Sequence, residues 1–185
     1  MQYSIAMQPA EMRGLRHDPT TIALHWISAL FVVLLWTIGQ TVDVFPNGPL
    51  RIDYRSVHIV LGVALGVVLL ARFGWRLTRR ETLPSIARGV MLAIARITHW
   101  LLYALLVVAV GFGIANAWVR GDSIFNVFRI PAYDPGNRAL MNLIGDRHAL
   151  FANAVLIVAG VHAAAALFHH YILRDATLRR MLPWR

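Results

Sequence analysis

Eight histidines are the residues of this 185-residue chain whose chemistry most needs an explanation. Imidazole carries protons, binds metals and is a common axial ligand of haem iron. Five of the eight lie in or beside long apolar stretches, at His25, His58, His99, His148 and His162. Ionisable side chains are costly in a membrane and are usually functional there. The absence of cysteine excludes thiolate-bound iron–sulfur clusters and covalent c-type haem.

The spacing of these histidines predicts two paired sites. His148 and His162 are fourteen residues apart, which in a helix is about 21 Å and nearly four full turns. One helix therefore presents two imidazoles on one face at two depths. His58 lies at the depth of His148, whereas His162 could pair with either His25 or His99. Two neutral imidazoles from facing helices can hold both axial positions of a b-type haem.

The elements that must position these histidines are four apolar stretches of about 20 residues, the length that crosses a hydrocarbon core about 30 Å thick. They cover roughly residues 21–41, 54–73, 97–119 and 147–173. With 58% hydrophobic and only 15% charged residues, the composition is that of a membrane protein. We expect an all-α integral membrane fold, a four-transmembrane-helix bundle over residues 21–173 that holds two b-type haems, with tails at 1–20 and 174–185.

All eighteen cationic residues are arginines, and the formal net charge is +9. The arginines lie between apolar stretches and not on one soluble face, which excludes a nucleic-acid partner. Twelve fall on the side of the two termini and six on the other. The positive-inside rule therefore predicts that both tails are cytoplasmic. Glu11 and Asp18 stand where a signal peptide would be basic, so we expect the first apolar stretch to be retained as an anchor.

Several motifs carry a resemblance to a known family. The run from Val161 to Tyr171 reads VHAAAALFHHY, and His25 and His58 stand in Leu-His-Trp and Val-His-Ile contexts. Together with His148, these motifs resemble the bacterial cytochrome b561 family over about residues 20–180.

The resemblance implies a bacterial inner membrane protein with two haems b. It implies that His25 and His162 bind the iron of the inner haem, that His58 and His148 bind the iron of the outer haem, and that His99 is not an axial ligand. It also implies an activity: oxidation of superoxide to oxygen at the periplasmic face, with electrons passed to ubiquinone.

Four arginines are candidate contacts for haem propionates or for an anion. Arg51, Arg55 and Arg147 lie at the level of the outer haem and could also attract superoxide, although interfacial arginine is an equally good interpretation. Arg72 lies at the inner level, where anchoring by the positive-inside rule is the simpler interpretation. His99 and His169 are candidate proton donors beside a quinone, whereas His17 and His170 are expected to be interfacial.

Two other function classes share some of these sequence features. The chain could be a cytochrome b subunit that links a periplasmic dehydrogenase or hydrogenase to the quinone pool, in which case it has a protein partner; short outer connections favour independent action. A haem-free transporter fits less well, because transporters place ionisable groups near the midplane. Membrane lipid, quinone and superoxide are the partners expected.

Overall fold

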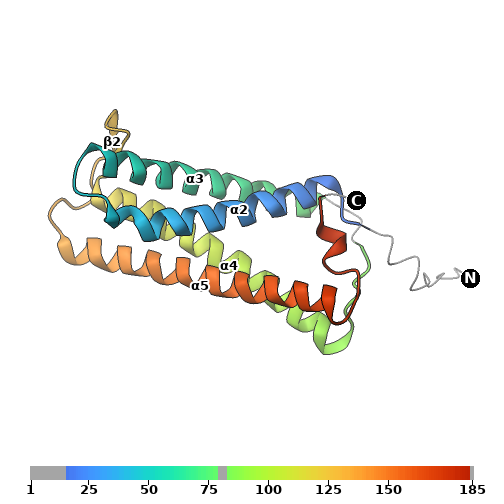
Figure 1. Cartoon of the computed structure of the whole chain (residues 1–185). Coiled ribbons are helices and arrows are strands. Elements are labelled where there is room, and N and C mark those ends of the chain that lie inside the picture. The colour runs from blue at the N-terminus through green and yellow to red at the C-terminus, as the bar shows by residue number, and fades with distance from the viewer. Residues whose placement is uncertain (1–15, 79–82, 184–185) are drawn as a thin grey trace, which may run out of the picture.

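The computed structural model describes residues 16–78 and 83–183 as a bundle of four long helices (Figure 1). These are α2 (Pro19–Thr41), α3 (Pro49–Thr78), α4 (Gly89–Arg120) and α5 (Arg138–Tyr171). α2 packs chiefly on α3 and α4 chiefly on α5, so that two helix pairs face each other. We call the end that carries the α2–α3 and α4–α5 connections the loop end. The opposite end, where the described parts of both termini lie, is the terminal end.

All four helices are long and apolar enough to cross a membrane. A small core forms between α2 and α3 around Leu35, Leu65 and Leu69. Most other apolar side chains point outwards; Val67 and Leu70 are 61% and 72% exposed. Such exposure is unfavourable in water and is expected where lipid covers the surface. The predicted class, an all-α membrane bundle of four helices, is confirmed.

The helices extend beyond the apolar stretches that predicted them. α5 begins at Arg138 and not near Arg147, because the Asn137 side chain caps the helix and accepts a hydrogen bond of 3.0 Å from the Leu140 N–H. α2 begins after Asp18, whose carboxylate accepts from the Thr21 N–H at 2.9 Å. Polar end residues lower the local hydropathy but not the helix propensity, so hydropathy alone stops short of these ends.

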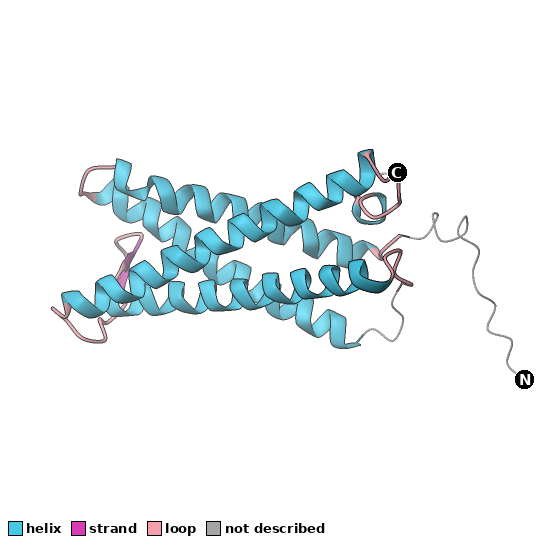
Figure 2. Cartoon of the chain, turned by 90° about the horizontal axis from the view of Figure 1, so that it is seen from below, coloured by secondary structure: helices cyan, strands magenta, loops and turns pink. Residues whose placement is uncertain are grey.

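The α4–α5 connection forms a small hairpin at the loop end (Figure 2). Its strands are β1 (Ser123–Ile124) and β2 (Phe128–Arg129). Gly121 ends α4 at φ 63°, and a Cβ there would lie 2.9 Å from the Ala132 Cβ. Ser56 of α3 is fully buried; its hydroxyl accepts from the Phe125 N–H at 2.8 Å and lies 3.1 Å from the Ser123 carbonyl oxygen. The hairpin is therefore fixed to the start of α3.

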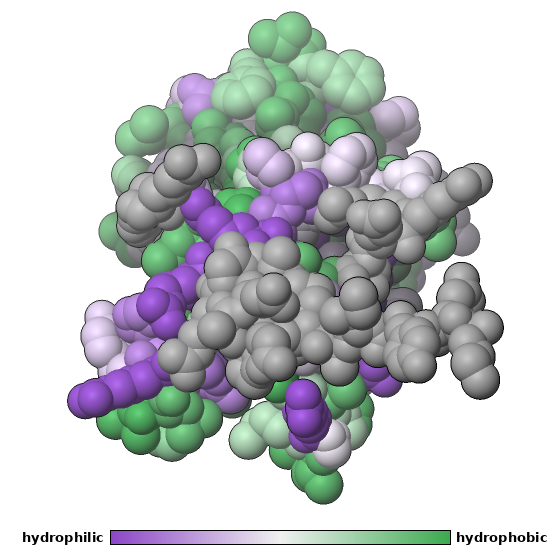
Figure 3. All heavy atoms as spheres, turned by 90° about the vertical axis from the view of Figure 1, so that its right-hand side faces the viewer, coloured by the Kyte–Doolittle hydropathy of each residue, from purple (hydrophilic) through white to green (hydrophobic). Residues whose placement is uncertain are grey.

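The C-terminal segment folds across the terminal end, where the 3₁₀ turn η2 spans Arg179–Met181. The Trp26 indole of α2 donates to the Met181 carbonyl at 2.7 Å, and the buried Arg180 donates to the Pro84 carbonyl at 2.8 Å. Figure 3 looks on this end: hydrophilic side chains gather there, and apolar side chains dominate the flanks behind them. Short elements η1 (Val42–Val44), β1 and β2 lie at the loop end.

Candidate functional site

One imidazole pair lies towards the loop end, between the two helix pairs. His58 of α3 and His148 of α5 have ring centres 5.9 Å apart and ring planes at 88°. The Nδ1 atom of His148 lies 3.0 Å from the Ala109 carbonyl oxygen of α4. Because a carbonyl only accepts, Nδ1 carries the proton and Nε2 keeps a lone pair for a metal.

Two glycines make room for this pair. A Cβ at Gly113 of α4 would lie 3.1 Å from Cε1 of His148, and a Cβ at Gly39 of α2 would lie 3.3 Å from Cε1 of His58. Each imidazole is therefore placed against the bare backbone of a neighbouring helix. A larger residue at either position would press on the ring.

A second histidine cluster lies towards the terminal end. His162 of α5 has its ring centre 6.4 Å from that of His25 on α2 and 5.3 Å from that of His99 on α4. The sequence spacing left both partners open, and the folded chain brings both to His162. His162 and His148 lie on the same helix, so α5 contributes to both clusters.

The geometry of both clusters fits haem. Two imidazoles on opposite sides of one iron have ring centres about 6 Å apart, because each metal–nitrogen bond is about 2 Å and each ring centre lies about 1 Å further. The separations of 5.9 Å for His58–His148 and 6.4 Å for His25–His162 match this value, whereas 5.3 Å for His99–His162 is short.

The donor set also fits haem better than a bare metal ion. Within residues 16–78 and 83–183, no group of three or more His, Cys, Asp or Glu side chains could hold a metal ion. A pair of imidazoles needs only two coordination positions, and a porphyrin supplies the other four. The donor set therefore fits a haem held by two histidines and does not fit a zinc-type site.

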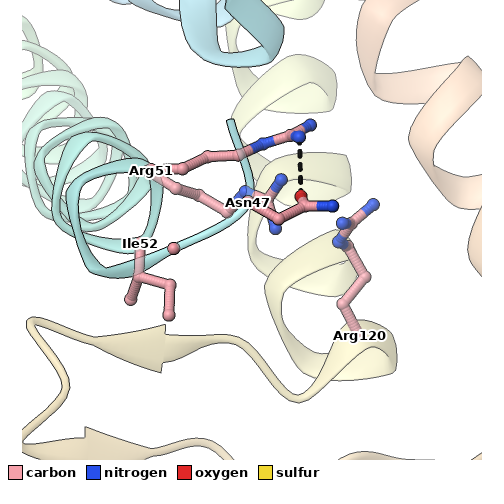
Figure 4. A pocket seen from close by; sticks show the side chains of 6 residues that line it. Asn47, Arg51, Ile52 and Arg120 are labelled. Atoms are coloured by element: carbon pink, nitrogen blue, oxygen red, sulfur yellow. Dashed lines mark hydrogen bonds between the residues drawn. The ribbon is translucent and has the colours of Figure 1, made fainter. Parts of the chain in front are cut away.

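A basic cavity of about 250 Å³ opens at the loop end. Figure 4 shows Arg51 of α3 and Arg120 of α4 reaching into it, with Arg51 Nη1 donating to Asn47 Oδ1 at 2.8 Å. Arg55 also lines the cavity and contacts Asp122 at 3.3 Å. Arg120 lies 3.7 Å from that carboxylate, so two guanidinium groups share one counter-charge. Arg51 is paired with a second carboxylate, that of Asp43.

The other predicted contacts are placed differently. Arg147 is exposed and is not among the residues that line the cavity. Arg72 donates hydrogen bonds inside the bundle, to Ser28, Leu24 and Tyr103. The simpler interpretation from the sequence was that Arg72 anchors the helix at the membrane surface. The structure instead places its guanidinium group in contact with two neighbouring helices.

His169 forms a close pair with a carboxylate at the terminal end. Its Nδ1 lies 2.6 Å from Asp175 Oδ2, and the Thr177 N–H donates to the other carboxylate oxygen at 2.8 Å. Burial would raise the pKa of Asp175, but these hydrogen bonds outweigh it and hold the pKa below its ordinary value. The Asp175 contact fixes the ring of His169 and leaves Nε2 available for a ligand.

The fold and the paired imidazoles define a class: a multi-pass membrane protein of the haem-binding, electron-transferring kind. The family model for prokaryotic cytochrome b561 matches residues 16–184. The chain therefore belongs to the prokaryotic cytochrome b561 family, whose members are b-type haem proteins of bacterial membranes.

Individual relatives agree with this assignment. The chain is 31% identical over 166 residues to a probable superoxide oxidase, CybB, of Yersinia pestis, covering 88% of this chain and 93% of that protein. It is 32% identical over 175 residues to cytochrome b561 homolog 1 of Escherichia coli K12, covering 92% and 98%. It is also 29% identical to cytochrome b562 of Cereibacter sphaeroides, over 87% of this chain and 91% of that protein.

The sequence did not single out the two glycines or Arg120. Gly39 and Gly113 act through their position against a ring on another helix, and spacing along one chain does not give that register. Arg120 stood among the six arginines of one side, but its sharing of Asp122 with Arg55 depends on the hairpin fold.

Proposed function

We propose that this protein oxidises superoxide to oxygen at the periplasmic face of the bacterial inner membrane and passes the electrons through two bis-histidine haems b to ubiquinone. Two superoxide anions give two oxygen molecules and two electrons; one quinone takes up two electrons and two protons to become quinol. Haem b, bound between each imidazole pair, supplies the one-electron chemistry. The loop end is then periplasmic, and both termini are cytoplasmic, as the arginine distribution predicts.

The observation that carries the proposal is the placement of two imidazole pairs at two depths of one bundle. His148 and His162 on α5 hold one side of each pair, and His58 and His25 hold the other. His25 is preferred over His99 for the inner pair because its separation from His162 leaves room for an iron atom. An electron that enters at one end of the bundle would thus find one haem site at each of the two depths and could pass from the first haem to the second.

The cavity of Arg51, Arg55 and Arg120 gives the loop end its specificity for an anion. Three guanidinium groups meet two carboxylates there, so the local balance is positive. Superoxide is a small anion, and a basic cavity raises its local concentration. The chain's own residues hold and orient the anion; none of them needs to act as a nucleophile.

His169 is the proposed proton donor to quinone at the terminal end. It follows His162 by seven residues, which is about two helical turns, so both lie on the same face of α5. Its Nδ1 is held by Asp175, so Nε2 can reach a quinone oxygen. His99, on the same side of the bundle, is a second candidate.

The test uses the purified, oxidised holoprotein. Superoxide is generated enzymatically while the haem absorption bands are followed, with and without ubiquinone. Fast haem reduction that ubiquinone reverses and superoxide dismutase abolishes is the expected result. Arg120→Gln should slow reduction by superoxide but leave reduction by dithionite unchanged. A protein with b-haem spectra that superoxide does not reduce would reject the proposal and favour an electron-transfer subunit for a periplasmic dehydrogenase or hydrogenase.

A further inference from the structure

Arg72 of α3 is held inside the bundle by contacts on two other helices. Its Nη1 lies 3.0 Å from Ser28 Oγ and 3.3 Å from the Leu24 carbonyl oxygen, both on α2. Its Nε lies 3.2 Å from the Tyr103 hydroxyl on α4, and its Cζ lies 5.3 Å from the centre of the Tyr103 ring. Two contacts with α2 and two with Tyr103 of α4 fix the position of the guanidinium group.

These contacts place the charge of Arg72 beside the histidines of the terminal-end cluster. Leu24 directly precedes His25, and Tyr103 lies one helical turn after His99. The guanidinium group therefore contacts a residue within one helical turn of each of these histidines.

The charge of Arg72 is not neutralised by a carboxylate. Within residues 16–78 and 83–183, Arg72 forms no ion pair, and all of its hydrogen-bond partners are neutral oxygens. Arg51 and Arg55, at the loop end, are each paired with an aspartate. The two ends of the bundle thus differ: at the loop end Asp43 and Asp122 compensate most of the charge of Arg51, Arg55 and Arg120, whereas within the described residues no carboxylate compensates Arg72.

We infer that Arg72 is a fixed positive charge that raises the reduction potential of the haem held by His25 and His162 above that of the haem held by His58 and His148. A cation close to a metal centre in a low-dielectric interior stabilises the reduced form, which carries one more electron. Electron transfer from the loop end to the terminal end is then favourable. The inference rests on the proposed haem arrangement and supplies its direction of electron flow.

The test is an equilibrium redox titration of the holoprotein, followed by haem absorbance. It is made on the full protein and in a His58→Ala background, where the proposal leaves only the inner haem. Arg72→Gln, which keeps hydrogen-bond donors but removes the charge, is expected to shift the inner potential to more negative values and leave the outer one unchanged. Arg72→Lys should recover most of the shift. Arg96→Gln removes an exposed charge at the same end and should have little effect.

Unchanged potentials in Arg72→Gln, or an equal shift of both haems, would overturn the inference. Should Arg72→Gln lose the inner haem, the double variant Ser28→Ala/Tyr103→Phe decides, because it releases the guanidinium group but keeps the charge on the chain. A more negative inner potential in that variant supports the inference, and an unchanged one rejects it. The titration uses neither superoxide nor quinone. Its result can therefore be interpreted even if the protein does not show the proposed superoxide oxidase activity.

Discussion

Replacing Gly113 with alanine is expected to weaken the binding of the outer haem. The added methyl group would lie 3.1 Å from Cε1 and 3.4 Å from Nδ1 of the His148 ring. Normal contacts between carbon atoms are about 3.5–4.0 Å, so the ring must move by several tenths of an ångström. The ring cannot move without cost, because its Nδ1 is hydrogen-bonded to the Ala109 carbonyl at 3.0 Å.

The magnitude follows from that hydrogen bond. Losing the partner that orients a metal-bound histidine typically weakens metal affinity about 10–100-fold. A buried polar group left without a hydrogen-bond partner costs about 1–3 kcal/mol. This free energy corresponds to a change in affinity of a similar size. We therefore expect Gly113→Ala to lower the affinity of the outer site for haem by this factor, with the inner haem retained.

The assay counts haem per chain by the pyridine haemochrome method after purification at limiting haem supply. Gly111→Ala is the matched control, since a Cβ at this position of the same helix would meet no atom within 4 Å. The result that refutes the reasoning is a full complement of haem in Gly113→Ala, or an equal loss in Gly111→Ala.

Three further predictions follow from individual contacts. His25→Ala should lose the inner haem while His99→Ala keeps both, as counted by haem content; the reverse would show that His99 is the ligand. Because hydrogen bonds hold the pKa of Asp175 below its ordinary value of 3.8, its ionised form stabilises the fold above that pH. This contribution is lost as the pH falls through the lower folded pKa, so thermal unfolding of Asp175→Asn should show a smaller drop below about pH 4; an equal drop would contradict the pairing. Ser56→Ala should cost about 1–3 kcal/mol in unfolding experiments because it removes a fully buried hydroxyl and the hydrogen bond that this hydroxyl accepts from the Phe125 N–H, whereas Ser123→Ala, which loses one long contact of 3.4 Å, should cost far less; equal costs would contradict this.

The sequence predicted the number and class of the helices because the apolar stretches exceed the length that a bilayer requires. It also predicted that His148 and His162 share a helix, since helical periodicity fixes that relation. It did not predict that α5 starts as early as Arg138, because the residues before Arg147 include the polar Asn142 and Asp146 and the start of the helix depends on the cap at Asn137.

The contacts between side chains of different helices could not be predicted from the sequence. The ring of His162 has both His99, at 5.3 Å, and His25, at 6.4 Å, as neighbours; spacing along the sequence could not give these distances because it does not fix the rotation of each helix. The same applies to Arg72: its position near the end of an apolar stretch indicates a membrane-surface anchor, yet its long side chain reaches Ser28 on another helix. The pairing of His169 with Asp175 depends on how the chain turns after α5.

The most direct test of the account is the number of haems bound by the protein and by one ligand variant. Native mass spectrometry of the purified protein, supported by haem absorbance, should find two haems b per chain. It should find one in His58→Ala, with the inner haem spectrum retained. One haem in the unaltered protein, or two in His58→Ala, would contradict the assignment of two histidine-paired sites.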